Sequence, residues 1–339
     1  MRKTFIVITS IADEHHSILK KIAARAVSHQ VPVILIGDSA SPASFKLEGC
    51  EFYSLKEQAI LPFALAQNLP TGHYSRKNLG YLLAISRGAE IIVETDDDNI
   101  PLATFWDERT DETEAYLLEN TGWTNVYRYF TEINIWPRGF ALEHLHKTLP
   151  SLRNFKLVKS PIQQGLADEN PDVDAIYRLT MPLPVYFNLS PSVALGNNSF
   201  CPFNSQNTTW FKEAFPLLYL PSHCSFRMTD IWRSFIAQRI AWTCGWPILF
   251  HNCTVRQERN THNLMTDFKD EISGYISNDA ILNRLKNLHL KDGAVNIPDN
   301  MRICYAALIE LGVFNALEEN LLEAWLEDIN LISQQFFDQ

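Results

Sequence analysis

The sequence predicts an α/β protein with a mixed, mainly parallel sheet flanked by helices, followed by a C-terminal helical appendage. Three observations support this fold class. Short runs rich in Val and Ile alternate with segments of helical spacing in the first hundred residues, as in strands joined by crossover helices. Acidic residues lie just after two of these runs, at Asp38 and Asp96. Near the C-terminus, hydrophobic residues from Leu308 to Leu322 recur every three or four positions, the period of a helix.

The first third of the chain sets the order of strands and helices. The strands are expected at 4–11, 31–36, 50–55 and 91–95, and the helices at about 17–27 and 77–87. Gly88 directly follows the second helix, and a glycine at that position commonly ends a helix. In open sheets of this kind, ligands bind beyond the carboxyl ends of the strands. The acidic residues are therefore predicted to lie at a ligand-binding edge.

The remainder of the chain divides into three parts. Several prolines interrupt residues 106–191, which predicts long loops and short strands around a cleft. A second ordered block spans about 193–264, and residues 301–337 have helical periodicity. We therefore expect one large domain at residues 1–275 and the helical appendage at 276–339.

Composition excludes several classes of protein. The formal net charge of the 339 residues is −10, and no run of Lys or Arg could neutralise a row of phosphates, which argues against a nucleic-acid partner. The six cysteines are scattered without a C-x-x-C pair, so free thiols are expected. No apolar stretch reaches the ~20 residues of a membrane span, and the first apolar run is too short for a signal sequence. We expect a cytoplasmic protein.

The strongest chemical signal is the acidic cluster Asp96, Asp97 and Asp98, which follows a hydrophobic strand. Adjacent carboxylates repel one another at a buried strand end unless solvent or a cation compensates their charge. Mg²⁺ or Mn²⁺ binds one or two protein carboxylates and completes its shell with water and substrate phosphate. Asp96 and Asp98 are thus candidate metal ligands, and Asp96 and Asp97 candidate substrate contacts.

Two other readings of the cluster remain open. A solvated acidic turn would need no ligand. A metal-dependent phosphohydrolase could use Asp96 as nucleophile and Asp98 as acid, although such a cluster normally follows the first strand rather than a later one. A calcium loop of the EF-hand type is excluded, because Ile100 occupies a position that requires an oxygen ligand.

Basic and polar residues at the start of the second helix are candidate nucleotide contacts. Arg76, Lys77 and Asn78 open that helix, and a helix N-terminus with basic side chains favours phosphate. Asp38, at the end of the second strand, could accept hydrogen bonds from a base or ribose. A surface helix start and a turn-forming Asp are the structural alternatives.

Candidates for the remaining roles come from the second ordered block. Asp230 lies in the first turn of a predicted helix, where it could act as a general base or simply stabilise the helix dipole. His251 and His262 are candidate further metal ligands, since imidazole suits Mn²⁺. The amide-rich segment 204–207 could bind carbohydrate or form a turn. Motifs of P-loop, dinucleotide-binding, zincin and hydrolase-elbow proteins are absent from the sequence.

Five segments together resemble the STELLO-type glycosyltransferase domain family over roughly residues 1–275. They are GDSASP, RKNLGYLLAISRGAEIIVETDDDN, CPFNSQNTTWF, FRMTDIWRSFIAQRIAW and RQERNTHNLMTDFKDE. The acidic cluster is also similar, more distantly, to reversibly glycosylated polypeptides, which act as sugar-nucleotide mutases. The plant STELLO proteins are membrane-anchored Golgi proteins linked to cellulose synthesis, and that location and partnership are not carried over to this chain.

The resemblance implies a GT-A-type, Rossmann-like fold and a nucleoside-diphosphate sugar donor, with a UDP-sugar favoured. It implies that Asp96, Asp97 and Asp98 bind the donor and Mn²⁺ or Mg²⁺. It places Asp230 at the acceptor base of inverting enzymes, and His262 in the matching R-N-x-H segment. The expected activity is therefore metal-dependent transfer of a sugar to a hydroxyl of a carbohydrate or glycan. A nucleotide-sugar mutase and a non-catalytic scaffold that binds nucleotide or partner proteins are the alternatives.

Overall fold

The computed structural model describes residues 2–259 and 263–337. Its strands are β1 (Thr4–Thr9), β2 (Val33–Ile36), β3 (Cys50–Tyr53), β4 (Ile91–Thr95), β5 (Asn99–Pro101), β6 (Glu112–Leu118), β7 (Gly122–Trp123), β8 (Phe155–Lys159), β9 (Ile162–Asp168), β10 (Val193–Leu195), β11 (Ser199–Phe200), β12 (Asn207–Phe211) and β13 (Ile248–Gln257). Its α-helices are α1 (Ser17–His29), α2 (Leu55–Gln58), α3 (Lys77–Ser86), α4 (Ala175–Thr180), α5 (Thr229–Thr243), α6 (Leu264–Lys286), α7 (Ile297–Glu310) and α8 (Glu318–Phe337).

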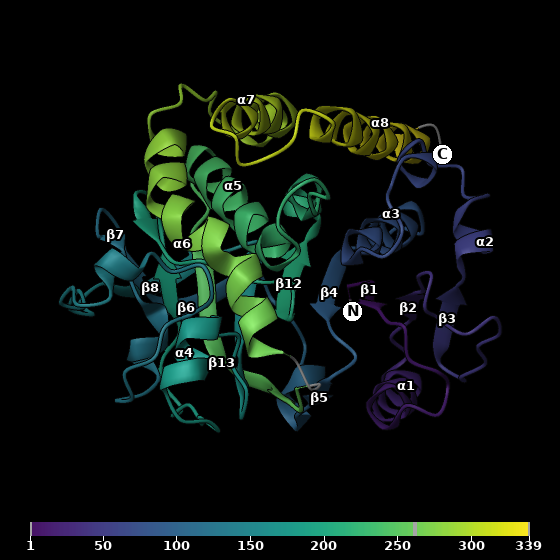
Figure 1. Cartoon of the computed structure of the whole chain (residues 1–339), viewed down its shortest axis with the longest axis horizontal. Helices are drawn as coiled ribbons and strands as arrows, with labels where there is room; N and C mark the ends of the chain where they lie inside the picture. The colour runs from purple at the N-terminus through teal and green to yellow at the C-terminus, as the bar shows by residue number, and fades with distance from the viewer. Residues whose placement is uncertain (1, 260–262, 338–339) are drawn as a thin grey trace.

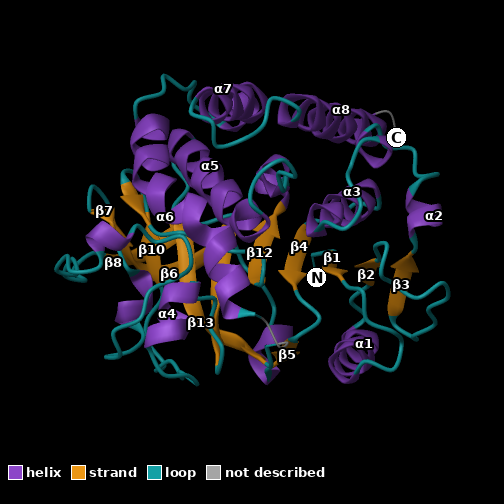
Figure 2. Cartoon of the chain, viewed as in Figure 1, coloured by secondary structure: helices purple, strands orange, loops and turns teal. Residues whose placement is uncertain are grey.

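A mixed sheet runs through the molecule and is flanked by helices (Figures 1 and 2). Within the described residues it has 11 strands, in the order β3-β2-β1-β4-β12-β9-β13-β10-β6-β8, with β5 paired to β13. The first four strands are mutually parallel, and antiparallel pairing begins where β12 joins β4. This architecture confirms the predicted fold class, a GT-A-like α/β fold.

The parallel half forms because β1 is apolar on both faces. Phe5 and Val7 point into the core that contains α3, whereas Ile6 and Ile8 point into the core that contains α1, as the alternation of side chains along a strand requires. Gly80 lets α3 approach this strand closely, since a Cβ atom there would lie 2.5 Å from Cγ1 of Val7. Figure 1 shows α1 and α3 on opposite faces of these strands.

Most predicted elements of this half are confirmed, with boundaries shifted by a few residues. The first strand ends at Thr9 rather than at residue 11, because the chain there turns toward α1. The helix α3 ends at Ser86, and Gly88 follows it with a φ of 78°. This is the left-handed conformation that glycine adopts without steric cost.

The C-terminal helices pack onto the rest of the chain. The boundary expected between residues 275 and 276 lies within α6, and the tail forms two helices, α7 and α8, that extend across one end of the molecule in Figure 1. Trp325 of α8 is fully buried, and its Nε1 donates to the carbonyl of Pro216 at 2.9 Å. Tyr305 of α7 packs beside Tyr219 in the same cluster. The C-terminal helices therefore share the main hydrophobic core.

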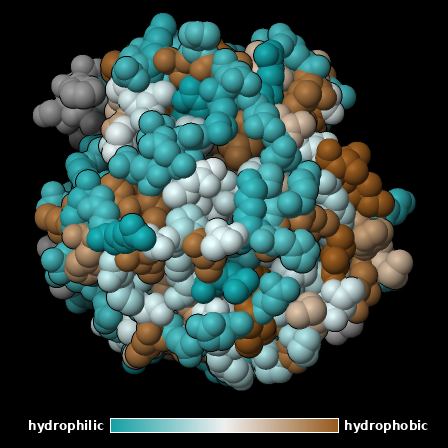
Figure 3. Space-filling model, turned by 90° about the vertical axis from the view of Figure 1, so that its left-hand side faces the viewer, coloured by the Kyte–Doolittle hydropathy of each residue, from teal (hydrophilic) through white to brown (hydrophobic). Residues whose placement is uncertain are grey.

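The outer surface carries hydrophobic side chains in separate patches among hydrophilic ones, on the face that Figure 3 displays. In the portion of the chain that the structure describes, no helix combines the length and the apolar character needed to cross a bilayer. The six cysteines are all free thiols, as predicted.

Replacing Asp328 by Ala should destabilise the whole fold. Asp328 is buried on α8 and accepts hydrogen bonds from the backbone N–H groups of Ala64 and Leu65, at 2.8 and 2.9 Å. The substitution leaves both donors without their acceptor, at a cost of about 1–3 kcal/mol each. Urea unfolding measures the loss. The exposed neighbour Glu327 provides the control, since its change to Ala should cost less than about 0.5 kcal/mol. Equal stability of the two variants would contradict a shared core.

Candidate functional site

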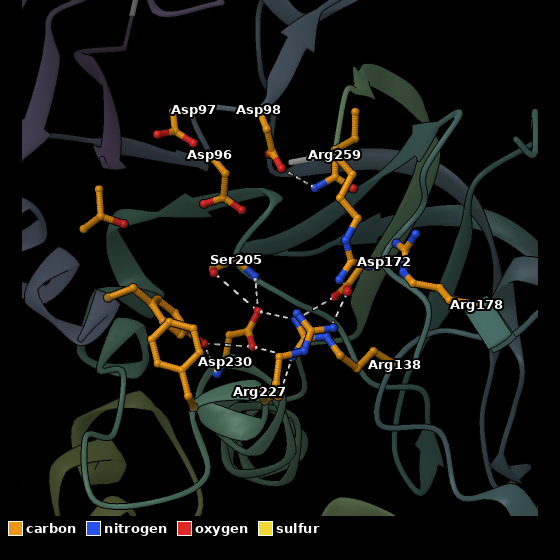
Figure 4. Close-up of a pocket in the computed structure, with 14 residues that line it drawn as sticks. Asp96, Asp97, Asp98, Arg138, Asp172, Arg178, Ser205, Arg227, Asp230 and Arg259 are labelled. Atoms are coloured by element: carbon orange, nitrogen blue, oxygen red, sulfur yellow. Dashed lines mark hydrogen bonds and ion pairs between the residues drawn. The ribbon is translucent and has the colours of Figure 1, made fainter. Parts of the chain in front are cut away.

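A cavity of about 280 Å³ lies at the carboxyl ends of β1 and β4, where ligands bind in open α/β sheets. Asp96, Asp97 and Asp98 line one side (Figure 4). Ser205 and Asp230 lie below them in this view, and Arg138, Arg178, Arg227 and Arg259 contribute further side chains to the lining. Tyr74 also lines the cavity. The predicted acidic cluster therefore does face a cavity rather than open solvent.

A buried ion pair fixes the strand that leads into the acidic cluster. Glu94 of β4 and Arg233 of α5 are both fully buried and form a two-pronged contact, with Nη2 of Arg233 3.0 Å from Oε2 of Glu94. Tyr81 of α3 donates its hydroxyl to Oε1 of Glu94 at 2.6 Å. Because both side chains are buried, removing one of them would leave the charge of the other uncompensated in the core. The end of β4 is thus held between two helices.

Each aspartate of the cluster has a different partner. Asp96 accepts from Nζ of Lys77 at 2.8 Å and keeps 37% of its side-chain surface exposed. Asp97 accepts from the hydroxyl of Ser10, just beyond β1. Asp98 accepts at Oδ2 from Nε2 of Gln257, at 2.9 Å, whereas its Oδ1 is buried without a hydrogen-bond partner in the described part of the chain.

The acidic side of the cavity disfavours negative charge. Burial, together with the neighbouring carboxylates of Asp96 and Asp97, raises the pKa of Asp98 to about 7. Burial also raises the pKa of Asp96, although the Lys77 ammonium partly opposes this effect. A cation placed between these carboxylates would remove both the repulsion and the desolvation cost.

The donor set suits Mg²⁺ or Mn²⁺. Across residues 2–259 and 263–337, no group of three or more His, Cys, Asp or Glu side chains could by itself hold a metal ion. These two ions need only one or two protein carboxylates, because water and substrate phosphate supply the other oxygens. The unpartnered Oδ1 of Asp98 and the part-exposed carboxylate of Asp96 are oxygens of this kind. The residues present therefore fit a divalent cation that binds together with a phosphate.

Arg76 and Asn78, at the start of α3, were predicted to contact a nucleotide, but neither lines the cavity. Arg76 is buried and donates to Oε1 of Gln58 and to the carbonyls of Leu69 and Pro70. Asn78 exchanges two hydrogen bonds with the backbone of Leu220. These contacts within the protein engage both side chains, which differs from the phosphate-binding role that their sequence position predicted.

Lys77 serves the site indirectly. Its ammonium is fully buried and donates to the carbonyl of Thr95 at 3.0 Å as well as to Asp96. It also lies 3.4 Å from the carbonyl of Ser205. These protein acceptors surround the ammonium, so Lys77 orients Asp96 rather than binding phosphate itself.

Asp38 organises a neighbouring loop. Its carboxylate accepts hydrogen bonds from the backbone N–H groups of Ser39, Gly72 and His73, at 2.7–2.8 Å. These bonds hold the segment that leads into Tyr74, which lines the cavity. The predicted contact of Asp38 with a base or ribose is not supported by this geometry, because backbone donors already occupy both of its oxygens.

Asp230 lines the cavity but is poorly suited to the role of catalytic base. Both of its oxygens lie 3.1 Å from the guanidinium of Arg138, and Ser205 donates its N–H to Oδ2, also at 3.1 Å. Burial raises the pKa of Asp230, but the Arg138 charge and its hydrogen bonds outweigh burial and hold the pKa well below its usual range. A carboxylate stabilised in this way is a weak proton acceptor.

His251 does not line the cavity of the acidic cluster. His251 lines a different cavity, and its Nδ1 lies 3.0 Å from the carbonyl of Asn252. Burial lowers its pKa to about 4. His262 lies outside the described residues. The amide-rich segment 204–207 is buried, and within it Ser205 reaches the cavity.

Sequence reasoning missed most of the basic side of the cavity. Arg138, Asp172 and Arg178 come from the irregular segment 106–191, where isolated charged residues resemble ordinary surface charges. Arg138 bridges Asp172 and Asp230, so it is the centre of this side. Arg227 and Arg259 lie in segments that the family resemblance includes, but no spacing rule singles them out.

Comparisons with known proteins agree with the family resemblance. Residues 227–338 match the family described as STELLO glycosyltransferases, so the match continues past residue 275 through α7 and α8. The chain is 29% identical over 324 residues to a protein named probable glycosyltransferase STELLO2 from Arabidopsis thaliana, covering 89% of this chain and 42% of that protein. It is 32% identical over 235 residues to probable glycosyltransferase STELLO1 of the same plant, covering 63% of this chain and 30% of that protein.

The chain therefore spans less than half the length of each of these relatives. The STELLO2 alignment extends over nine tenths of the chain. The chain is therefore similar to STELLO-type glycosyltransferases over most of its length.

Proposed function

We propose that the chain transfers a sugar from a nucleotide-sugar donor, with a UDP-sugar favoured, to a hydroxyl of a carbohydrate acceptor, and that Mn²⁺ or Mg²⁺ is required. The observation that carries this proposal is the carboxylate of Asp98, which faces the cavity with one oxygen unpartnered. A buried oxygen of this kind is costly in the absence of a ligand. The names of the relatives support the reaction class.

The residues of the chain have separate tasks in this proposal. Asp96 and Asp98 would hold the cation, which supplies positive charge for the leaving diphosphate. Lys77 orients Asp96 and opposes the rise in its pKa that burial causes. Ser10 positions Asp97 through its hydroxyl, and that carboxylate faces the cavity where the donor's sugar or ribose would lie.

Asp230 acts as a positioning residue in this proposal. It fixes Arg138 and accepts at Oδ1 from the hydroxyl of Tyr74, at 3.0 Å. Inversion at the anomeric carbon, which the family resemblance implies, would require Asp230 to accept a proton from the acceptor. The pairing with Arg138 opposes that step. The proposal of metal-dependent sugar transfer therefore does not include inversion or retention at the anomeric carbon. The anomeric configuration of the first product, followed by proton NMR, measures the stereochemical outcome directly.

The change of Asp98 to Ala should abolish metal-dependent donor binding. A saturating ligand at about 100 times its Kd stabilises a protein by about 2.7 kcal/mol, which raises the melting temperature of the wild type. The variant loses an oxygen ligand of the cation, so Mn²⁺ should no longer increase the shift that a UDP-sugar produces.

Thermal unfolding with a UDP-sugar, with and without Mn²⁺, measures this effect. The exposed Asp292 supplies a control, because its change to Ala removes the same charge far from the cavity. Unchanged metal-dependent stabilisation in the Asp98→Ala protein would refute the metal assignment. Release of free sugar or a glycosylated product by the wild type would exclude a non-catalytic scaffold.

The change of Asp98 to Asn should stabilise the metal-free protein at neutral pH. The folded-state pKa of Asp98 is raised to about 7 from the ordinary 3.8. Its contribution to stability is therefore fully present below about pH 4 and is lost as the pH rises through 7. Asn carries no charge, so the variant avoids this loss.

Urea unfolding in the presence of a chelator, at pH 5 and pH 8, tests the expectation. The stability difference between Asp98→Asn and the wild type should be larger at pH 8 than at pH 5. A difference that stays constant over this range would mean that the carboxylate is not desolvated in the way the cavity indicates.

A further inference from the structure

The basic side of the cavity has a feature that the proposed donor and metal contacts do not use. Three of its four arginines each form an ion pair with a carboxylate of the protein. These pairs are Arg138 with Asp172 at 2.8 Å, Arg227 with Glu271 at 2.8 Å and Arg259 with Asp267 at 2.5 Å. Their charges are thus balanced within the protein.

Arg178 differs from the other three. Among the described residues, no Asp or Glu forms an ion pair with its guanidinium. Its Nη2 donates to the carbonyl of Pro171 at 2.9 Å, and its Nη1 reaches Oδ1 of Asn170 only at 3.5 Å. Its Nε is buried and has no acceptor in the described structure. A guanidinium has five N–H donors in a planar fork, so most of this hydrogen-bonding capacity is unused.

The electrostatic surroundings leave the charge of Arg178 uncompensated. Burial, together with the adjacent charges of Arg259 and Arg227, lowers its pKa to about 9, against the opposing effects of Asp172 and Glu271. The guanidinium nevertheless remains charged at neutral pH. An unpaired charge held away from water is costly, and an anion bound there would offset that cost.

The position of Arg178 separates it from the nucleotide end of the cavity. Thr9, Asp96 and Asp97 come from the ends of β1 and β4 in the parallel half, where open α/β sheets bind nucleotides. Arg178 comes from α4, which follows β9 beyond that half and packs against α6. Figure 4 shows it on the side of the cavity away from Asp96 and Asp97.

We propose that Arg178 binds an oxyanion carried by the acceptor, so that the acceptor of this protein is an anionic carbohydrate. The word acceptor rests on the proposed function. The planar fork of N–H donors of a guanidinium matches two oxygens of either a carboxylate or a phosphate. The shared chemistry is therefore a negatively charged oxygen group on the sugar, and the experiment distinguishes a carboxylate from a phosphate.

The test uses the full chain loaded with UDP and Mn²⁺, so that the donor end is filled. Glucuronate, glucose 6-phosphate and neutral glucose are titrated in separate calorimetric experiments. At least one anionic sugar should bind about tenfold or more tightly than glucose, because a hydrogen bond to a charged group contributes about 1.5–3 kcal/mol. The tighter of the two anionic sugars identifies the source of the oxyanion.

Replacing Arg178 by Gln should lower the affinity for the anionic sugar by about tenfold or more. The affinity for UDP should change by less than about twofold. The matched control is Arg239→Gln. Arg239 also donates to backbone carbonyls, those of Leu285 and Leu288, but does not line the cavity. Its replacement should leave both affinities unchanged. If the Gln protein does not fold, Arg178→Lys carries the test, since Lys keeps the charge but loses the fork and should bind the anionic sugar more weakly.

Two results would overturn the proposal. Equal binding of all three sugars by the wild type would show that no oxyanion is recognised. A parallel loss of UDP and anionic-sugar affinity in Arg178→Gln would assign the arginine to the donor diphosphate. Failure of the proposed function looks different: UDP and Mn²⁺ would not bind, while the anionic sugar would still bind the nucleotide-free protein through Arg178.

Discussion

The buried ion pair between Glu94 and Arg233 is the contact on which the site depends. Glu94 lies two residues before the acidic cluster, and Arg233 lies one helical turn after Asp230. A single interaction therefore sets the position of the acidic side of the cavity relative to the helix that carries Asp230. Tyr81 extends this network to α3. Removing either charge would leave the other buried and unpaired, so the pair constrains the cavity and the core together.

The cavity itself has two electrostatic halves. The acidic half is under-compensated, with three adjacent carboxylates and one lysine, and it is completed by a cation in our proposal. The basic half is nearly balanced, since Asp172, Asp230, Glu271 and Asp267 neutralise its arginines. Each half therefore has one group whose charge the protein does not satisfy: Asp98 on the acidic side and Arg178 on the basic side. A ligand with complementary charges at its two ends would fit both.

Sequence patterns predicted the parallel half of the fold well, because its inner strands β1, β2 and β4 are covered on both faces and are built around runs of apolar residues. The acidic cluster could also be placed in a cavity, since the end of such a strand is a defined location. The antiparallel strands and the basic half were not predicted. Their geometry depends on contacts between distant residues, such as Arg138 and Asp230, which lie 92 positions apart. The contacts of Asn78 differ from the expected ones for the same reason, because its partner Leu220 lies 142 positions away. Arg76 is instead engaged by the carbonyl of Leu69 in the loop just before it, which the sequence pattern did not indicate.

The hydrogen bonds from Ala64 and Leu65 to Asp328 have a practical consequence for anyone who seeks a minimal folded fragment. The region that matches the family, residues 227–338, contributes only β13 to the described sheet. Expressed alone, it would lack the strands that carry the aspartates and would expose the apolar faces of α5 and α8. Removing the last sixty or so residues would instead uncover the cluster around Tyr219. The N-terminal strands and the C-terminal helices are thus both needed for the fold. Attempts to shorten the chain should remove internal loops rather than the C-terminal helices.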